Sequence, residues 1–187
     1  MTQSPSLKDH FLVALPTLAD PNFARSVTYL CEHSEEGAMG LVVNRPSPLT
    51  LGDIFEHMEI EVGPGTPVEQ PVFMGGPVQN DRGFLLHKPP RRWDSTLVVT
   101  DELAVTTSRD ILQAMARGEG PEQVLVTLGY AGWGPGQLES ELAEDAWLVT
   151  PASSEIIFDL PPEQRWEAAA ALAGVDLNLI TSTAGHA

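Results

Sequence analysis

The chain has 187 residues, 42% of them hydrophobic and 19% charged, which is the composition of a soluble globular protein with a sizeable core. Its formal net charge is −16, divided into −5 for residues 1–100 and −11 for residues 101–187. A surface this acidic disfavours nucleic acids and anionic membranes as partners, because both are bound mainly through Lys and Arg.

We expect no signal peptide in the N-terminal region of this sequence. Residues 1–16 lack the basic region and long apolar run of a signal peptide, and no segment approaches the roughly 18 apolar residues of a membrane helix. Cys31 is the single cysteine, so no intrachain disulfide can form. We therefore expect a cytoplasmic protein without a membrane-spanning segment.

The first part of the chain alternates short apolar runs with turns. Runs rich in β-forming residues predict strands at 10–15, 26–33 and 38–44. Residues 34–37 read as a hairpin connection between the second and third of these strands. The proline-rich residues 45–48 are expected to end the third strand.

A helix is predicted over residues 50–58, followed by a loop. Its apolar residues fall at i, i+3, i+4 and i+7 and so share one face: Leu51, Ile54, Phe55 and Met58. Thr50 and Asp53 have the spacing of a capping box at its start. Residues 61–71 hold two glycines and three prolines and are the best internal loop.

The second part of the chain mixes strands and helices. Helices are predicted over 108–117, after the glycine-rich stretch through Glu144, and over 161–173. Thr107 and Asp110 have capping-box spacing before the first of them. Short strands are predicted at 71–74, 83–87, 96–100, 123–130, 146–150 and 156–158. Strands that come in runs early and alternate with helices later indicate an α+β fold with a mixed, largely antiparallel sheet.

Familiar catalytic and metal-binding motifs are missing. The sequence has no phosphate-binding loop, dinucleotide fingerprint or nucleophile elbow, and no His or Cys pair with metal-ligand spacing. Cys31 and His33 lie two residues apart, but a cysteine on a strand is usually a small buried hydrophobe, and we favour that interpretation. No catalytic residue, cofactor or metal is therefore assigned.

Three segments at the ends of predicted elements could instead bind a ligand. Asn44 with Arg45 could recognise a carboxylate or phosphate, or could form a turn with a surface ion pair. Gly75 and Gly76, with Arg82 nearby, could offer backbone N–H groups to an anion, although a tight chain reversal is favoured. Thr107 and Ser108 could form an anion site at a helix N-terminus, although plain capping is favoured.

The stretch LGYAGWGPGQLESEL, residues 128–142, combines four glycines with Tyr130 and Trp133. It could form a rigid ligand-facing loop in which Gln137 and Glu139 supply hydrogen bonds. Alternatively, it is a strand-to-helix corner whose aromatic side chains fill the core. The corner explains the glycines and aromatics well, but it gives no reason for Gln137 and Glu139.

Taken in order, these motifs resemble the YqgE/AlgH family of bacterial proteins. The stretches that carry the resemblance cover nearly the whole chain: DPNFARSVTYL (20–30), GAMGLVVNRP (37–46), FMGGPVQNDRGFLLH (73–87), TTSRDIL (106–112), GEGPEQVLVTLGYAGWGPGQLESEL (118–142) and GHA (185–187). The resemblance implies one α+β domain over residues 1–187 with a variable loop near 58–71. It also implies a bifurcated, pseudo-barrel sheet flanked by helices.

The resemblance supplies no catalytic residues, because the biochemical activity of that family is not established. One branch carries the label of a transcriptional regulator of alginate synthesis in pseudomonads. We hypothesise a shallow cleft that gathers ten residues from predicted element ends: Asn44, Arg45, Gly75, Gly76, Arg82, Thr107, Ser108, Tyr130, Trp133 and Gln137.

Three classes of function remain open on the sequence. The first is a non-enzymatic regulatory or adaptor protein that binds a small ligand or a protein partner and affects gene expression indirectly. The second is an enzyme of unrecognised type that acts on an anionic or amide-bearing small molecule. The third, a direct DNA-binding regulator, is ranked last because of the net charge of −16.

Overall fold

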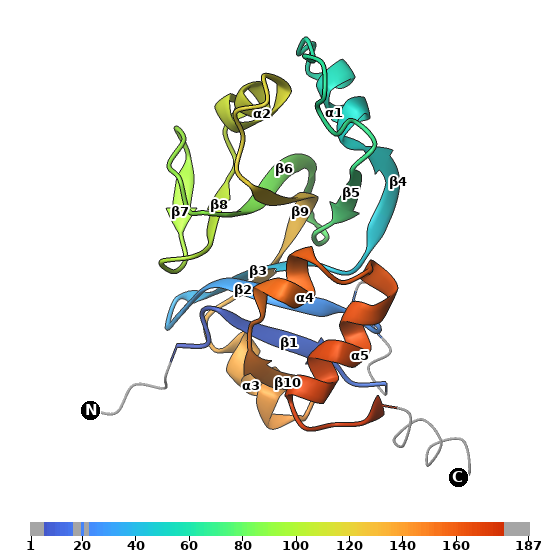
Figure 1. The fold of residues 1–187 in the computed structure, drawn as a ribbon. Helices are drawn as coiled ribbons and strands as arrows, with labels where there is room; N and C mark the ends of the chain where they lie inside the picture. The colour runs from blue at the N-terminus through green and yellow to red at the C-terminus, as the bar shows by residue number, and fades with distance from the viewer. Residues whose placement is uncertain (1–5, 17–19, 21–22, 178–187) are drawn as a thin grey trace. The chain divides into compact units, whose positions relative to one another are not determined.

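The computed structural model describes residues 6–16, 20 and 23–177 and shows two compact units (Figure 1). The first unit holds Met1–Asn44 and Ala131–Ala187, and the second holds Arg45–Tyr130. The second unit is therefore an insertion between two segments of the first. The single domain with a variable loop near residues 58–71 stays a prediction. The Pro21-Asn22 part of the DPNFARSVTYL motif and the GHA motif lie outside the described residues.

The first unit is built on an antiparallel sheet. Its strands follow the order β10 (Trp147–Pro151), β1 (His10–Ala14), β2 (Val27–Ser34), β3 (Gly37–Val42) and the last residues of β9 (Gln123–Trp133). Side chains alternate between its two faces. Leu12, Ala14 and Leu30 accordingly share one hydrophobic core with Trp133 and Trp147.

The first unit also contains three helices: α3 (Gln137–Ala143), α4 (Ser154–Phe158) and α5 (Pro162–Leu172). Leu138 of α3 is buried in the core that holds Trp133 and Trp147, whereas α5 packs against β1, β2 and β10. The strand predicted at 156–158 is wrong, because Ser153 accepts the N–H of Ile156 and begins α4. No helix in the described part of the chain is long and apolar enough to cross a membrane.

Helix α5 is tied to the first unit by a buried arginine. Arg165 Nη1 donates to the carbonyl oxygen of Val43 at 2.6 Å, and its Nε donates to that of Leu160 at 3.0 Å. Burial lowers the pKa of Arg165 to about 10.

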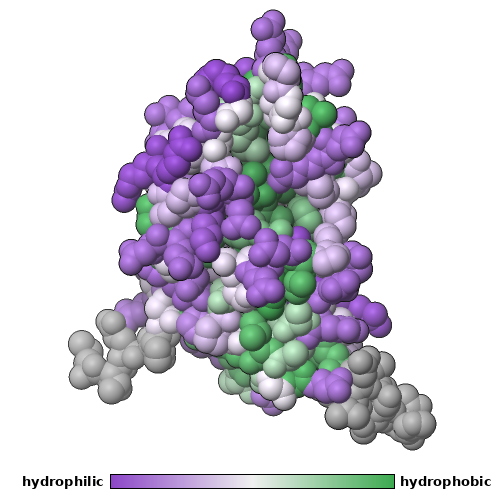
Figure 2. Space-filling view, viewed as in Figure 1, coloured by the Kyte–Doolittle hydropathy of each residue, from purple (hydrophilic) through white to green (hydrophobic). Residues whose placement is uncertain are grey.

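On the face shown in Figure 2, hydrophobic residues gather over the region of α4 and α5, and hydrophilic residues cover most of the remainder.

The second unit also has a mostly antiparallel sheet. Its strands are β4 (Pro46–Thr50), β5 (Pro71–Met74), β6 (Val78–Lys88), β7 (Thr96–Val98), β8 (Ala104–Thr106) and the first part of β9. β9 has β6 and β5 as neighbours in this unit, and β5 is its one parallel partner within the described residues. The α+β class and the largely antiparallel sheet that branches at β9 are confirmed.

Two helices of the second unit cover a common core: α1 (Leu51–His57) and α2 (Arg109–Ala116). The members of this core are Leu51, Phe55, Val72, Leu85, Ile111, Leu112, Met115, Ala116 and Val126. The capping box of Thr50 and Asp53 at the start of α1 is confirmed. The capping box expected of Thr107 and Asp110 is wrong, because α2 begins after Ser108 and has no side-chain capping bond.

Strand β9 contains a glycine that the neighbouring strand crosses closely. Gly129 has a φ of +77°, a left-handed conformation that favours glycine. The register of β6 jumps from Val78 opposite Tyr130 to Gly83 opposite Leu128, so residues 79–82 of β6 bulge out opposite Gly129 alone. A Cβ on Gly129 would overlap the carbonyl oxygen of Gly76 and lie 3.0 Å from Cα of Asn80. The bulge therefore depends on a missing side chain.

The corner after β9 is held by one carboxylate. Glu141 Oε1 accepts the indole N–H groups of Trp133 at 3.0 Å and Trp147 at 2.9 Å. Gln137 donates to Glu141 Oε2 at 3.0 Å, and its own Oε1 accepts the N–H of Gly134 at 3.0 Å. Gln137 thus has a structural reason that the sequence did not reveal, since it closes the corner and orients Glu141.

We expect Glu141→Ala to lower the free energy of unfolding by about 2–4 kcal/mol, because two buried indole N–H groups would lose their acceptor. Glu144→Ala, at an exposed position at the end of the same helix, should change it by less than about 0.5 kcal/mol. Urea unfolding followed by tryptophan fluorescence measures both. Equal effects of the two substitutions would contradict the role of Glu141.

The close approach at Gly129 predicts a second pair of substitutions. Gly129→Ala should cost about 2–5 kcal/mol, because the left-handed φ and the overlap with the β5–β6 turn both oppose a side chain. Gly136 has a similar φ of +73°, but a Cβ there would meet no atom within 4 Å. Gly136→Ala should therefore cost only about 1–2 kcal/mol. A smaller loss at Gly129 than at Gly136 in urea unfolding would refute the close approach.

His87 predicts an acid-sensitive fold. His87 is fully buried, with Nδ1 donating to the carbonyl oxygen of Pro89 and Nε2 accepting from Thr106 Oγ1. Burial lowers its pKa below the unfolded value, so the stability it contributes is present above pH of about 6.5 and is lost as pH falls through the folded pKa. Unfolding free energies measured from pH 8 to 5 should fall less steeply for His87→Gln. His57→Gln, at an exposed position, should keep the wild-type slope.

Candidate functional site

The second unit contains a partly enclosed cavity of about 200 Å³. Four segments form its wall: the end of α1, the bulge of β6, the start of α2 and the middle of β9. The lining residues are Ile54, His57, Met58, Asp81, Arg82, Gly83, Leu85, Thr107, Ser108, Arg109, Leu112, Val126 and Leu128. Three of the ten residues predicted from the sequence, Arg82, Thr107 and Ser108, meet here.

The floor of the cavity is apolar. Leu85, Leu112 and Val126 are buried members of the second-unit core, and Ile54 and Leu128 pack against the same core. These side chains are fixed by their positions on β6, α2, β9 and α1, so the floor is formed by the core itself. A ligand that reaches it would remove apolar surface from water.

The rim of the cavity is charged. Arg82 and Arg109 are both exposed, and neither forms an ion pair with a carboxylate in the part of the chain that the structure describes. Arg82 Nη2 donates to Thr107 Oγ1 at 3.3 Å, and Arg109 Nη2 donates to the carbonyl oxygen of Met58 at 2.6 Å. These bonds to neutral acceptors orient the guanidinium groups without pairing them directly with a carboxylate.

The Ser108 hydroxyl is already hydrogen-bonded within the protein, both as donor and as acceptor. Its Oγ accepts the N–H of Ser95 at 3.0 Å and donates to Asp110 Oδ1 at 2.5 Å, while Asp110 Oδ2 accepts the N–H of Asp94 at 2.8 Å. Ser108 and Asp110 therefore hold the loop before β7 against the start of α2. Thr107 differs, because its Oγ1 accepts from Arg82 and its hydroxyl proton has no acceptor among the described residues.

Four other predicted residues lie in the second unit outside the cavity lining. Gly75 and Gly76 form the turn between β5 and β6, where the N–H of Gly75 donates to Leu128 and is not offered to an anion. Tyr130 packs edge-on against Phe84, with the ring centroids 5.3 Å apart, and Cζ of Arg82 lies over the Phe84 ring at 5.8 Å from its centroid. Arg45 precedes β4, where its carbonyl oxygen accepts the N–H of Met74.

The remaining three predicted residues belong to the first unit. Asn44 accepts the N–H of Val27 and donates to the carbonyl oxygen of Arg25, both at 2.9 Å, so its amide fixes the start of β2. Trp133 and Gln137 belong to the corner around Glu141. The hypothesis of one cleft for all ten residues stays a prediction; the cavity in the second unit contains three of them.

Sequence reasoning missed most of this cavity. Arg109 directly follows Thr107 and Ser108, and Asp81 directly precedes Arg82, so each adjoins a residue that was singled out. His57 lies one helical turn after Ile54, on the face whose period was already recognised. The signal available was therefore the neighbourhood of the predicted residues, whereas the floor depends on pairing between distant strands.

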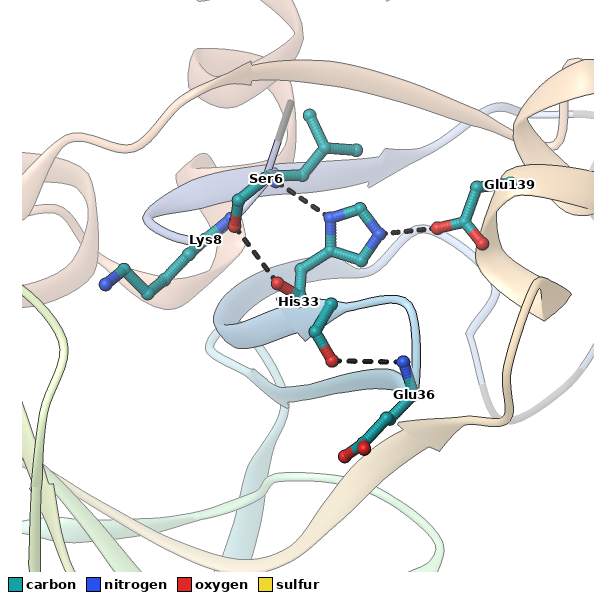
Figure 3. Close-up of polar contacts among 7 residues, drawn as sticks. Ser6, Lys8, His33, Glu36 and Glu139 are labelled. Atoms are coloured by element: carbon teal, nitrogen blue, oxygen red, sulfur yellow. Dashed lines mark hydrogen bonds and ion pairs between the residues drawn. The ribbon is translucent and has the colours of Figure 1, made fainter. Parts of the chain in front are cut away.

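A second polar cluster lies in the first unit around His33 (Figure 3). The N–H of Leu7 donates to His33 Nδ1 at 2.8 Å, which requires the proton of the neutral ring to be on Nε2. Nε2 then donates to Glu139 Oε1 at 2.5 Å. Both ring nitrogens are therefore used to tie β2 to the N-terminal segment and to α3, and Glu139 gains the structural reason that the sequence lacked.

Cys31 and Tyr29 of β2 are both fully buried. Burial raises the pKa of the Cys31 thiol far above its usual range, and burial together with the hydrogen bond to Asp9 does the same for the Tyr29 hydroxyl. A thiol without thiolate character is not a nucleophile, so the buried-hydrophobe interpretation of Cys31 holds. No group of three or more His, Cys, Asp or Glu residues within the described ranges could hold a metal ion.

Comparison with known proteins relates the whole chain to one group. A family model described as AlgH-like matches residues 11–178. A UPF0301 protein of Thioalkalivibrio sulfidiphilus is 60% identical over 187 residues, covering 100% of both chains, and one of Nitrosococcus oceani is 57% identical over 180 residues, covering 96% of each.

Solved structures agree with the match. The solution structure of the AlgH protein from Pseudomonas aeruginosa has a TM-score of 0.81 and 54% identity, with 100% of both chains covered. The crystal structure of a Corynebacterium diphtheriae protein has a TM-score of 0.72 and 22% identity, covering 96% of this chain and 93% of the other, and it supports the fold alone. The resemblance expected from the motifs is confirmed, and the chain belongs to the AlgH-like family.

Proposed function

We propose that this protein is a non-enzymatic cytoplasmic regulatory protein that binds a small organic anion in the cavity of its second unit. In this proposal, occupancy of the cavity is the signal, and any effect on gene expression is indirect. The observation that carries the proposal is the combination of two guanidinium groups without carboxylate partners and an apolar floor within one cavity.

This combination is characteristic of a binding site. Ligand cavities are mostly apolar, with a few polar groups placed to orient the ligand. Arginine binds carboxylates and phosphates through paired N–H donors, and such charge-assisted bonds are among the strongest in proteins. A pair of surface arginines on a plain convex surface would offer the charge without the desolvated floor.

The arrangement of Ser108 favours binding over catalysis. A nucleophilic serine needs a base that takes its proton and a path to the substrate. Ser108 instead donates to Asp110 while it accepts from the backbone of Ser95, and Asp110 is itself bound by the backbone of Asp94. This network serves the loop, so Ser108 is not arranged as a nucleophile.

A thermal-shift screen tests the proposal. We expect at least one compound from a panel of small carboxylates, phosphorylated metabolites and nucleotides to raise the melting temperature, since binding to the folded state adds about 2.7 kcal/mol at a hundredfold excess over Kd. Arg82→Gln and Arg109→Gln should each weaken the same compound about tenfold or more, because a charge-assisted hydrogen bond is lost.

Arg117→Gln is the matched control. Arg117 is an exposed arginine at the other end of α2, where it pairs with Glu119. It should leave the affinity within about twofold of wild type, and chromatography of the incubated compound should show no conversion. A hit that all three variants bind equally would contradict the site, and turnover that depends on Arg82 would favour the enzyme hypothesis.

A further inference from the structure

We infer that the ligand of this cavity is a small monocarboxylate with a single apolar tail, an inference that rests on the proposed function and narrows it to one chemical class. Its carboxylate would lie at the rim with Arg82 and Arg109, and its tail would lie on the floor formed by Leu85, Leu112 and Val126. Size, charge and polarity each select this class.

Size favours small ligands. The cavity has a volume of about 200 Å³. Cavities that hold drug-sized ligands begin at about 300 Å³. A linear acid of roughly eight to ten non-hydrogen atoms fits such a space with its head group at the opening, whereas a nucleotide or a coenzyme would leave most of its surface in water.

Charge selects a monoanion. Arg82 and Arg109 contribute two positive charges to the lining, and Asp81 contributes one negative charge. The formal charges of these three side chains sum to plus one, which a single carboxylate neutralises. A phosphate monoester carries about −1.5 to −2 at neutral pH, so it would bring excess negative charge close to Asp81. A dicarboxylate would bring a second charge onto the floor, where no donor is available in the described lining.

The division of the lining into rim and floor sets the orientation. Both arginines are exposed, and Thr107 beside Arg82 keeps a hydroxyl proton to donate. The two arginines are therefore placed at the opening and Thr107 is half-buried, while Leu85, Leu112 and Val126 are buried. Gly83 also lines the cavity, and a Cβ there would meet only Leu85 Cδ1, at 3.7 Å. Its missing side chain leaves room for a tail.

Isothermal titration calorimetry of the full chain with a series of linear acids tests this inference. The dissociation constant should fall about fourfold for each methylene added from butanoate to octanoate, because each one removes apolar surface from water on the floor. Octanamide and octanedioate should bind at least tenfold more weakly than octanoate, since one lacks the charge and the other carries a second charge. Adenosine monophosphate and inorganic phosphate should show no binding at the same concentrations.

Two variants test which residues contact the tail of the ligand and which contact its carboxylate. Gly83→Val adds a side chain at a strand position with space for it, so it should fold, and it should weaken octanoate at least tenfold while changing butanoate by less than threefold. Arg82→Gln should weaken both acids by the same factor. Backbone amide NMR shifts on octanoate binding should map to the cavity lining and not to α5.

The outcomes distinguish failure of the monocarboxylate class from failure of the anion site itself. If a phosphate, dicarboxylate or nucleotide binds more tightly than octanoate and loses affinity in Arg82→Gln, the anion site stands and the monocarboxylate class is overturned. If octanoate binds to Gly83→Val and to Arg82→Gln as tightly as it binds to the wild-type chain, its binding is nonspecific and the inference is overturned. If no compound of any class binds in calorimetry, the proposed function fails with it.

Discussion

The structure depends on the close approach of the β6 bulge to Gly129. Four residues of β6 lie opposite that single glycine, and a side chain there would overlap the β5–β6 turn. The bulge contains Asp81 and Arg82, so the same contact that lets the strands pair also sets the charged rim of the cavity. A β-bulge next to a functional site is a common way to redirect a side chain without losing the sheet.

Strand β9 contributes residues to the sheets of both units. Its residues up to Leu128, together with Tyr130, pair with β5 or β6, and its last three residues pair with β3. The stretch that follows is closed by Glu141, which holds two indole rings. The part of the glycine-rich segment after Tyr130 is therefore a structural corner in the first unit. The segment contributes to the site only through Gly129 of the second unit, where the absence of a side chain leaves room for the bulge of β6.

Local patterns predicted the elements, and pairing between distant segments determined the site. The apolar face of α1 and its capping box were readable because both depend on residues within one turn. The three apolar residues at 156–158 fit either period, and the capping by Ser153 decided for a helix. β4 was missed because its prolines read as a stop, although they are tolerated in a strand that pairs on one side with β5 alone. Arg82 and Thr107 could be singled out, whereas nothing local indicates that they meet.

The acidity of the chain and the proposed anion site are compatible because they act over different distances. Residues 45–130 hold seven of the ten Lys and Arg residues, yet the net charge of that segment is still −5. At physiological ionic strength, exposed charges are screened beyond about 8 Å, so a small acid in the cavity interacts mainly with Arg82 and Arg109. A polyanion extends beyond that distance and meets the acidic remainder of the surface. In the proposal, the net charge therefore disfavours nucleic acid while the local rim attracts a monoanion, so the charge of the chain would contribute to selectivity.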